Sequence, residues 1–252
     1  MMTTFEQNTA LITGGSSGIG LATAHALLAQ GARRVYITGR DRTKLAAARE
    51  QLGERAIAVA CDSADVASLA ALHSEIALRG DRLDILFANA GMAFHNAFGD
   101  TTPVTFDRLF DTNVKGVFFT VQTLLPLVSD GGSIILNASI AANLGMPNLS
   151  LYNASKAAVR SFARSWASDL KARRIRVNAI SPGVTRTPIL ESGLGMNDAQ
   201  IDGVEQFLGE ASPAGRMGES NEIAAAVLFL ASTSASYVNG TELVVDGGHS
   251  QV

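Results

Sequence analysis

Short apolar runs alternate with longer amphipathic segments along most of the chain. The apolar runs are continuous, and they predict strands near residues 9–13, 34–38, 56–61, 84–88, 132–138, 175–181 and 241–245. The segments between them predict helices near residues 18–30, 42–52, 65–79, 106–129, 150–173 and 219–232. Continuous apolar strands separated by helices are typical of a parallel sheet that is covered on both faces. We therefore predict an α/β fold with a doubly wound, mostly parallel seven-stranded sheet.

Glycine, proline and polar residues follow directly after several predicted strands. They are Gly14, Asp62, Asn89, Ser139 and Pro182. In a doubly wound sheet the carboxyl ends of the parallel strands meet at one edge, and ligands bind there. We therefore expect these residues to contribute to a single site.

Composition is consistent with one large core. The chain has 252 residues, 47% of them hydrophobic, and a mean hydropathy of +0.19, and it contains no low-complexity stretch. We predict a single domain over residues 1–252, and the motifs described below indicate that it is a dinucleotide-binding and catalytic domain. The net charge of −3 and the lack of a basic stripe argue against a nucleic-acid partner.

Targeting, membrane and metal signals are not found in the sequence. The first 32 residues contain no lysine or arginine, and no apolar run reaches the length of about 18 residues expected of a transmembrane helix. We expect a cytoplasmic protein without a membrane partner. Cys61 has no second cysteine to pair with and is predicted to be buried. No Cys/His cluster indicates a metal site.

The first predicted strand runs into a glycine-rich turn and then a helix. Glycines at 14, 18 and 20 allow close backbone approach to a phosphate, and the helix N-terminus attracts its negative charge. Such turns also occur in loops without a ligand, but the position at the first strand–helix junction favours a dinucleotide pyrophosphate. The residues predicted to bind it are Gly14, Ser16, Ser17, Gly18, Ile19 and Gly20.

The end of the second strand indicates which nicotinamide cofactor is preferred. An Asp or Glu about 20 residues past the glycines would bond the ribose 2′-OH of NAD. This chain has Gly39 and Arg40 there, and a guanidinium suits the 2′-phosphate of NADP(H). The alternative is a solvated Arg40 with Asp41 weakening its field. Arg42 and Lys44 are expected on the surface, although Arg42 could assist.

Tyr152 and Lys156 lie four residues apart in a predicted helix, and Ser139 lies upstream. This spacing places the two side chains on one helix face, about 5–6 Å apart at Cβ. An ammonium at ~4 Å in an effective dielectric of ~20 contributes about 4 kcal/mol, which would lower a tyrosine pKa of about 10 towards neutrality. Tyr152 is then a candidate general acid/base with Ser139 holding the reacting oxygen. The alternative is an ordinary amphipathic helix.

Together these residues resemble the short-chain dehydrogenase/reductase family, in its branch of roughly 250 residues. The similarity extends over nearly the whole chain, and further landmarks appear in the family's order. These are Asp62, Asn89-Ala90-Gly91, Asn113, Pro182-Gly183, Thr187 and Asp246-Gly247-Gly248. The resemblance implies a Rossmann-like fold and hydride transfer between a nicotinamide cofactor and a secondary alcohol or ketone.

The resemblance also implies roles for individual residues. Asp62 would contact the adenine, with Ser63 beside it. The Asn89-Ala90-Gly91 turn would lie beside the adenosine ribose, with Asn89 partly structural. The nicotinamide would bind near Pro182, Gly183 and Val184, with Thr187 on its carboxamide.

On the catalytic side, the resemblance implies that Lys156 bonds the nicotinamide ribose. Asn113, within the helix predicted over 106–129, would hold a water that links Lys156 to solvent. The family commonly forms homotetramers, so the apolar stripe of Phe162, Trp166 and Leu170 and the tail to Val252 are expected to meet neighbouring subunits. Packing within the chain would explain the same stripe.

Residues 186–218 predict an apolar, glycine-hinged lid over the substrate. Residues 93–95 and 141–146 are expected to form the other pocket walls, without a catalytic role for His95. No cluster of Arg or Lys occurs among them, which favours a hydrophobic alcohol or ketone.

Three functions remain open. The first is an NADP(H)-dependent alcohol dehydrogenase or ketone reductase. The second is a 3-oxoacyl thioester reductase, which would need basic surface for an acidic carrier protein, whereas the lid has mainly Arg186 and Arg216. The third is a non-catalytic dinucleotide sensor, which would ordinarily lack Tyr152 or Lys156.

Overall fold

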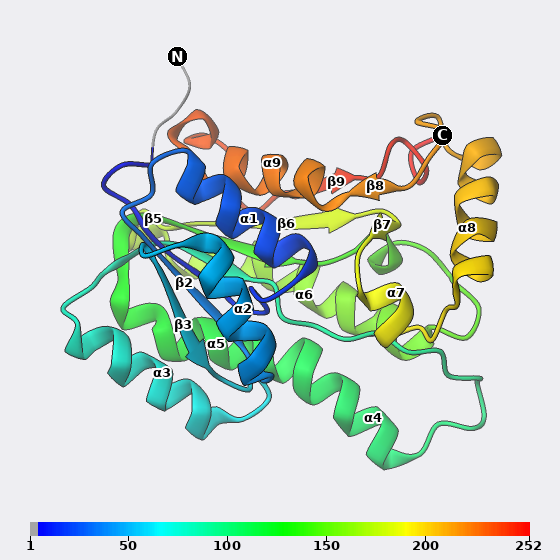
Figure 1. The fold of residues 1–252 in the computed structure, drawn as a ribbon, viewed down its shortest axis with the longest axis horizontal. Coiled ribbons are helices and arrows are strands. Elements are labelled where there is room, and N and C mark those ends of the chain that lie inside the picture. Colours follow the sequence, from blue (N-terminus) through cyan, green and yellow to red (C-terminus); the bar gives the residue numbers. More distant parts are fainter. Residues whose placement is uncertain (1–4) are drawn as a thin grey trace.

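A parallel sheet of seven strands forms the centre of the computed structural model, which describes residues 5–252 (Figure 1). In sheet order the strands are β3 (Ala56–Ala60), β2 (Arg34–Gly39), β1 (Thr9–Ile12), β4 (Leu83–Ala88), β5 (Val128–Asn137), β6 (Arg176–Pro182) and β9 (Glu242–Val245). The strand order reverses between β1 and β4, which is the point where doubly wound sheets bind ligands. The predicted fold class is confirmed.

Helices cover both faces of the sheet, and each face has its own apolar core. Helices α1 (Gly18–Ala29), α2 (Arg42–Leu52) and α9 (Ser220–Ala231) pack on one face. Helices α3 (Val66–Leu78), α5 (Gly116–Leu124) and α6 (Ser150–Asp169) pack on the other. Because both faces are covered, the central strands are apolar at almost every position.

The single helix predicted over residues 106–129 is wrong. The structure has α4 (Pro103–Phe110), one turn of π-helix (Asp111–Lys115), α5, and a short 3₁₀ turn (Leu125–Leu127). Strand β5 already begins at Val128. Pro126 cannot donate a helical hydrogen bond, which explains the early end of the helix, and π turns often mark functional sites. Asn113 lies in the π turn.

The region predicted as a lid contains secondary structure that the sequence did not suggest. Two short strands, β7 (Thr185–Arg186) and β8 (Gly218–Glu219), pair in parallel at its base. Between them lie α7 (Ile189–Ser192) and α8 (Asp198–Ala211), beyond the carboxyl ends of the main strands (Figure 1). A separate small core of Leu190, Ile201, Leu208 and Met217 holds the two helices together.

Within residues 5–252, no helix is long and apolar enough to cross a membrane. The same residues contain no cluster of three His, Cys, Asp or Glu side chains that could hold a metal ion. Cys61 is a free, buried thiol, as expected, and burial raises its pKa.

Candidate active site

A cavity of about 470 Å³ opens at the carboxyl edge of the sheet. It brings together nearly all of the residues that the sequence placed in the site. These are Gly14, Ser16, Ser17, Gly18, Ile19, Gly39, Arg40, Asp62, Ser63, Asn89, Ala90, Gly91, Ser139, Tyr152, Lys156, Pro182, Gly183, Val184 and Thr187. Gly20 and Asn113 do not line the cavity but support residues that do.

The glycine turn has the geometry required to receive a pyrophosphate. Gly14 has φ +64°, and a Cβ on Gly20 would lie 2.4 Å from the Gly14 carbonyl oxygen, so only glycine fits at position 20. Ser17 begins α1 without a side-chain cap, and no acidic residue lies in the first turn. The N–H groups of that turn therefore remain available, with the positive end of the helix dipole, for a negatively charged group.

Hydrogen bonds between Thr13 and Asn89 join the end of β1 and the start of this turn to the end of the neighbouring strand, β4. Thr13 Oγ1 accepts hydrogen bonds from the N–H groups of Asn89 at 3.0 Å and Ala90 at 2.9 Å. Asn89 Nδ2 donates to the carbonyls of Thr13 and Gly14, at 2.9 and 3.2 Å. Both residues hold strand ends together, as the sequence suggested in part for Asn89.

Lys156 is buried one helical turn beyond Tyr152. Its Nζ donates to the Asn137 carbonyl at 2.7 Å and lies 5.7 Å from the centroid of the Tyr152 ring. Burial lowers the pKa of Lys156 from 10.5 to about 8. Asn137 was not predicted as a site residue, although its place two residues before Ser139 at the end of β5 was a usable signal.

The expectation that Lys156 lowers the pKa of Tyr152 to neutrality is wrong for this structure. The pKa of Tyr152 is raised, because burial disfavours the phenolate, and a hydrogen bond with Ser139 offsets only part of that effect. Lys156 makes no hydrogen bond to the phenol here, since its ammonium is directed to Asn137. Tyr152 is therefore a neutral phenol at physiological pH and can donate a proton.

Asn113 joins the turn after β4 to α6, the helix that carries Tyr152 and Lys156. Its Oδ1 accepts from Met92 N at 2.8 Å, and its Nδ2 donates to Met92 O at 2.9 Å and to Ser155 Oγ at 3.1 Å. Ser155 in turn donates to the Tyr152 carbonyl at 2.7 Å. The side chain of Asn113 is thus engaged with protein atoms, and its role in holding a water remains a prediction.

Two cations line the end of the cavity near β2. Arg40 and Lys44 are exposed and both face the cavity. The Asp41 carboxylate caps α2, accepting from the N–H groups of Thr43 and Lys44. Lys44 was expected only on the surface, but its helix follows Arg40 so closely that its side chain reaches the cavity. Arg42 is exposed and does not line it.

The opposite end of the cavity is apolar. The predicted wall residues Ala93, Ala141 and Met146 line it, whereas Phe94 and His95 do not. The lid contributes Ile189, Leu190 and Leu194. Met92, Ile140 and Leu149 also line the cavity and were missed, although each lies close in sequence to a predicted wall. Among the described lining residues, Lys156 is the charged group at this end.

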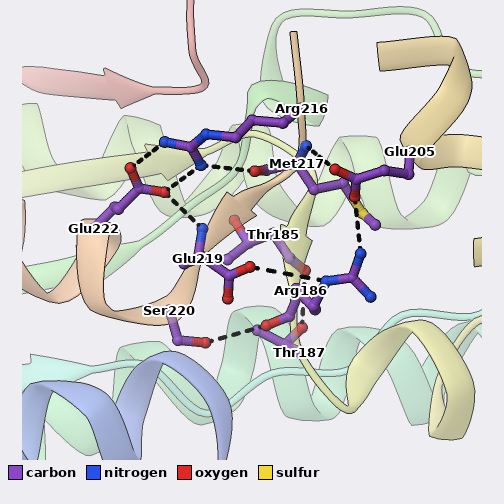
Figure 2. Close-up of polar contacts among 9 residues, drawn as sticks. All are labelled: Thr185, Arg186, Thr187, Glu205, Arg216, Met217, Glu219, Ser220 and Glu222. Carbon is purple, nitrogen blue, oxygen red and sulfur yellow. Dashed lines mark hydrogen bonds and ion pairs between the residues drawn. The ribbon is translucent and has the colours of Figure 1, made fainter. Parts of the chain in front are cut away.

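Ion pairs fasten the base of the lid (Figure 2). Arg186 Nη2 lies 2.9 Å from Glu205 Oε2 of α8, and Arg186 Nε lies 3.8 Å from Glu219 Oε1 of β8. Arg216 pairs with Glu222, with contacts of 2.6 and 2.8 Å. Both lid arginines therefore have carboxylate partners.

The segment that begins at Arg186 lies beside the glycine turn. Thr187 follows Arg186 directly and lines the cavity. A Cβ on Gly18 would lie only 3.3 Å from Thr187 Cγ2, so the segment that follows β7 approaches the glycine-turn end of the cavity.

Comparisons with known proteins agree with this geometry. Residues 14–250 match a family model described as "Enoyl-(Acyl carrier protein) reductase". The chain is 41% identical over 246 residues to oxidoreductase asL5 of Sarocladium schorii, with 97% of this chain and 96% of that protein covered. The chain belongs to the short-chain dehydrogenase/reductase family.

Solved structures of other short-chain dehydrogenases/reductases superpose on nearly the whole chain. The levodione reductase structure has 33% identity and a TM-score of 0.90, with 98% of each chain covered. A putative betaketoacyl-ACP reductase has 40% identity and a TM-score of 0.84, with 98% of this chain and 100% of that chain covered.

This short-chain dehydrogenase/reductase is accordingly an oxidoreductase, and its family typically uses a nicotinamide dinucleotide.

Proposed function

We propose that this protein uses NADP(H) to interconvert hydrophobic ketones and secondary alcohols. One observation carries the proposal. A single cavity joins the glycine turn and the cations near β2 to Ser139, Tyr152, Lys156 and an apolar chamber. Such a cavity suits a cofactor whose reactive end meets an apolar substrate.

The residues around the cavity fit a nicotinamide dinucleotide. The uncapped N-terminus of α1 would receive the pyrophosphate, with Asp62 and Ser63 beside the adenine and Thr187 and Lys156 at the nicotinamide end. Bound there, the cofactor supplies hydride to a carbonyl carbon or removes it from a carbinol carbon.

Arg40 and Lys44 support a preference for NADP(H). Arg40 and Lys44 line the same end of the cavity and favour a 2′-phosphate, although Asp41 lines that end as well. The neighbouring Asp41 is engaged in capping α2.

Proton transfer is assigned to Tyr152. In reduction its phenol donates a proton to the substrate oxygen as that oxygen gains negative charge, and in oxidation the phenolate removes the hydroxyl proton. Ser139 Oγ orients the substrate oxygen. The Lys156 ammonium, held near the phenol ring by the Asn137 carbonyl, stabilises negative charge on the phenolate after donation.

The test is oxidation of NADPH against NADH by purified protein across a panel of ketones. The panel runs from small to bulky and includes levodione, since a levodione reductase is among the similar structures. We expect turnover of apolar ketones with NADPH preferred. Equal or better use of NADH would contradict the assignment of Arg40 and Lys44.

Reduction of 3-oxoacyl thioesters is a second candidate, favoured by the similarity to a putative betaketoacyl-ACP reductase. An acidic carrier protein would need free positive charge near the cavity mouth. Arg186 and Arg216 are instead paired with glutamates. A 3-oxoacyl thioester in the same panel decides between the candidates: turnover faster than that of every simple ketone would favour the carrier-linked reaction.

We also propose a cytoplasmic homotetramer, as the family resemblance implies. Phe118, Phe162 and Trp166 form a partly exposed aromatic cluster on α5 and α6 that another subunit could cover. Sedimentation of the purified protein at the mass of a monomer, 26.3 kDa, would contradict the assembly.

A further inference from the structure

Glu242, the first residue of β9, contacts three separate segments of the chain. Its Oε1 accepts hydrogen bonds from Asn143 Nδ2 at 2.9 Å and from Ser181 Oγ at 2.7 Å. Its Oε2 forms an ion pair with Arg160 Nε at 2.6 Å. The Glu242 side chain is only 13% exposed, and Ser181 is fully buried.

Each of these partners belongs to a segment that carries a part of the proposed site. Asn143 follows the 3₁₀ turn Ile140–Ala142, which begins at Ser139. Ser181 directly precedes Pro182, at the end of β6. Arg160 lies one turn beyond Lys156 and two turns beyond Tyr152, so all three share one stripe of α6.

The register of the sheet directs Glu242 to these partners. In the parallel pair β6–β9, Glu242 lies opposite Ala179, whose side chain belongs to the core beneath α6. Side chains on neighbouring strands at paired positions share a face, and Ser181 is two residues beyond Ala179. The carboxylate therefore sits between the sheet and the catalytic helix, where all three partners can reach it.

A carboxylate in this position is stabilised only while its partners remain in place. Charge-assisted contacts offset the loss of its hydration, and removal of the carboxylate leaves Arg160 and Ser181 without their partner. The ion pairs at the lid base have side chains 37–54% exposed, so water can replace them more easily than it can replace the contacts of Glu242.

We propose that Glu242 is a positioning residue that holds the Ser139 turn, the catalytic helix and the end of β6 at a fixed distance from one another. It touches neither cofactor nor substrate and acts through Ser139, Lys156 and Pro182. This inference rests on the proposed function for its effect on turnover. A displacement of about 1 Å among reacting groups can cost up to about 100-fold in rate.

The test compares Glu242→Ala and Glu242→Gln with Asp81→Asn. Asp81 is a matched control, because it is a buried carboxylate that binds Arg33, Arg34 and Tyr36 at the opposite edge of the sheet. We would measure kcat and KM for an apolar ketone, NADPH affinity by fluorescence, and the thermal midpoint of each variant.

We expect Glu242→Ala to lower kcat about 10- to 100-fold. Glu242→Gln should recover much of this loss, because its amide oxygen still accepts from Asn143 and Ser181. Asp81→Asn should lower the thermal midpoint while kcat at 25 °C stays within twofold of the wild type. If Glu242→Ala does not fold, a several-fold loss of kcat in Glu242→Gln carries the same conclusion.

A kcat within twofold of the wild type in both folded Glu242 variants would overturn the inference. Equal losses of kcat in Glu242→Ala and Asp81→Asn would also overturn it, because stability alone would then explain both. Wild-type protein that binds NADPH but reduces no ketone would refute the proposed function instead. In that case the NADPH affinity tests the role of Glu242. Weaker NADPH binding in Glu242→Ala but not in Asp81→Asn would support the positioning role, and unchanged NADPH binding in Glu242→Ala would refute that role.

Discussion

At the scale of single residues, burial shifts the pKa values of Tyr152 and Lys156 away from their ordinary values in opposite directions. Burial raises the pKa of Tyr152, so the phenol is neutral and ready to donate a proton. Burial lowers the pKa of Lys156 to about 8, so its ammonium is still the main form at neutral pH. In the proposed function, the neutral phenol is the form that donates a proton to the carbonyl oxygen during reduction.

Replacing Tyr152 by Phe removes the proposed proton donor while keeping the ring. We expect kcat to fall at least 100-fold, in line with the contribution of about 10²–10⁴ from general acid catalysis. NADPH affinity, measured by fluorescence titration, should change less than threefold. Turnover that is unaffected by this substitution would show that Tyr152 is not the proton donor, whereas cofactor binding without turnover in the wild type would indicate the non-catalytic sensor.

Arg40 and Lys44 are expected to distinguish the two nicotinamide cofactors. We expect Arg40→Ala to raise KM for NADPH about tenfold, which corresponds to about 1.4 kcal/mol, and to leave KM for NADH unchanged. Lys44→Ala should act in the same direction with a smaller effect. Arg42→Ala is the matched control, because Arg42 is an exposed neighbour outside the cavity. An equal effect in the control would show that general surface charge, not a phosphate site, is responsible.

At the scale of elements, the region predicted as a lid has a small apolar core of its own, and its two ends pair with each other as β7 and β8. Its apolar core joins α7 and α8 and also includes Met217 and Val184 beside β8 and β7, and one exposed ion pair, Arg186–Glu205, holds α8 to the base as well (Figure 2). Exposed pairs contribute only about 0.2–1 kcal/mol each. The ion pair is therefore a small part of the attachment of α8, and it is the part that salt can screen.

Glu205→Gln is expected to loosen this lid by removing the ion pair with Arg186. KM for the ketone should rise about two- to fivefold, the range that corresponds to an exposed pair, because the closed position that covers the substrate becomes less populated. Added salt should raise the wild-type KM and leave that of the variant nearly constant, since screening weakens the pair.

The control for this lid variant is Glu75→Gln, which removes a pair with Arg79 of similar exposure on α3. Its KM and its salt dependence should match the wild type. A KM in Glu205→Gln that equals the wild type at low salt would show that the ion pair does not hold the lid.

At the scale of the whole molecule, the residues of the proposed site lie at the carboxyl ends of the strands, whereas a group of stabilising charges lies at the opposite ends. The cavity and its buried ammonium lie at the carboxyl edge, whereas Asp81 and its arginines lie at the other. A buried charge at the functional edge opposes folding, because the ammonium loses hydration there.

The free-energy cost of burying the Lys156 ammonium predicts that the stability of the protein depends on pH. The pKa is about 8 in the folded chain against 10.5 for an ordinary lysine, so the unfolded chain binds more protons between these values. The free energy of unfolding should therefore rise with pH across this window. Between pH 7 and pH 9 we expect a gain of about 1 kcal/mol relative to Lys156→Met, measured by urea unfolding of both proteins. Parallel pH profiles of the two proteins would contradict the lowered pKa.

Much of the architecture followed from local patterns that need no tertiary information. Continuous apolar runs identified the seven strands, and the glycines at 14, 18 and 20 identified the tight turn between β1 and α1. Residues after strand ends converge in any doubly wound sheet. That rule explains why nearly all of the predicted site residues line one cavity.

The sequence by itself therefore determined the fold class, the family and the edge of the sheet where the site lies, because these follow from periodicity and short-range motifs. Only the tertiary structure decided the π turn at Asn113, the raised pKa of Tyr152, the ion pairs of the lid and the three contacts of Glu242. Each of these depends on desolvation or on contacts between residues far apart in the chain. Spacing along a single strand or helix carries no measure of either.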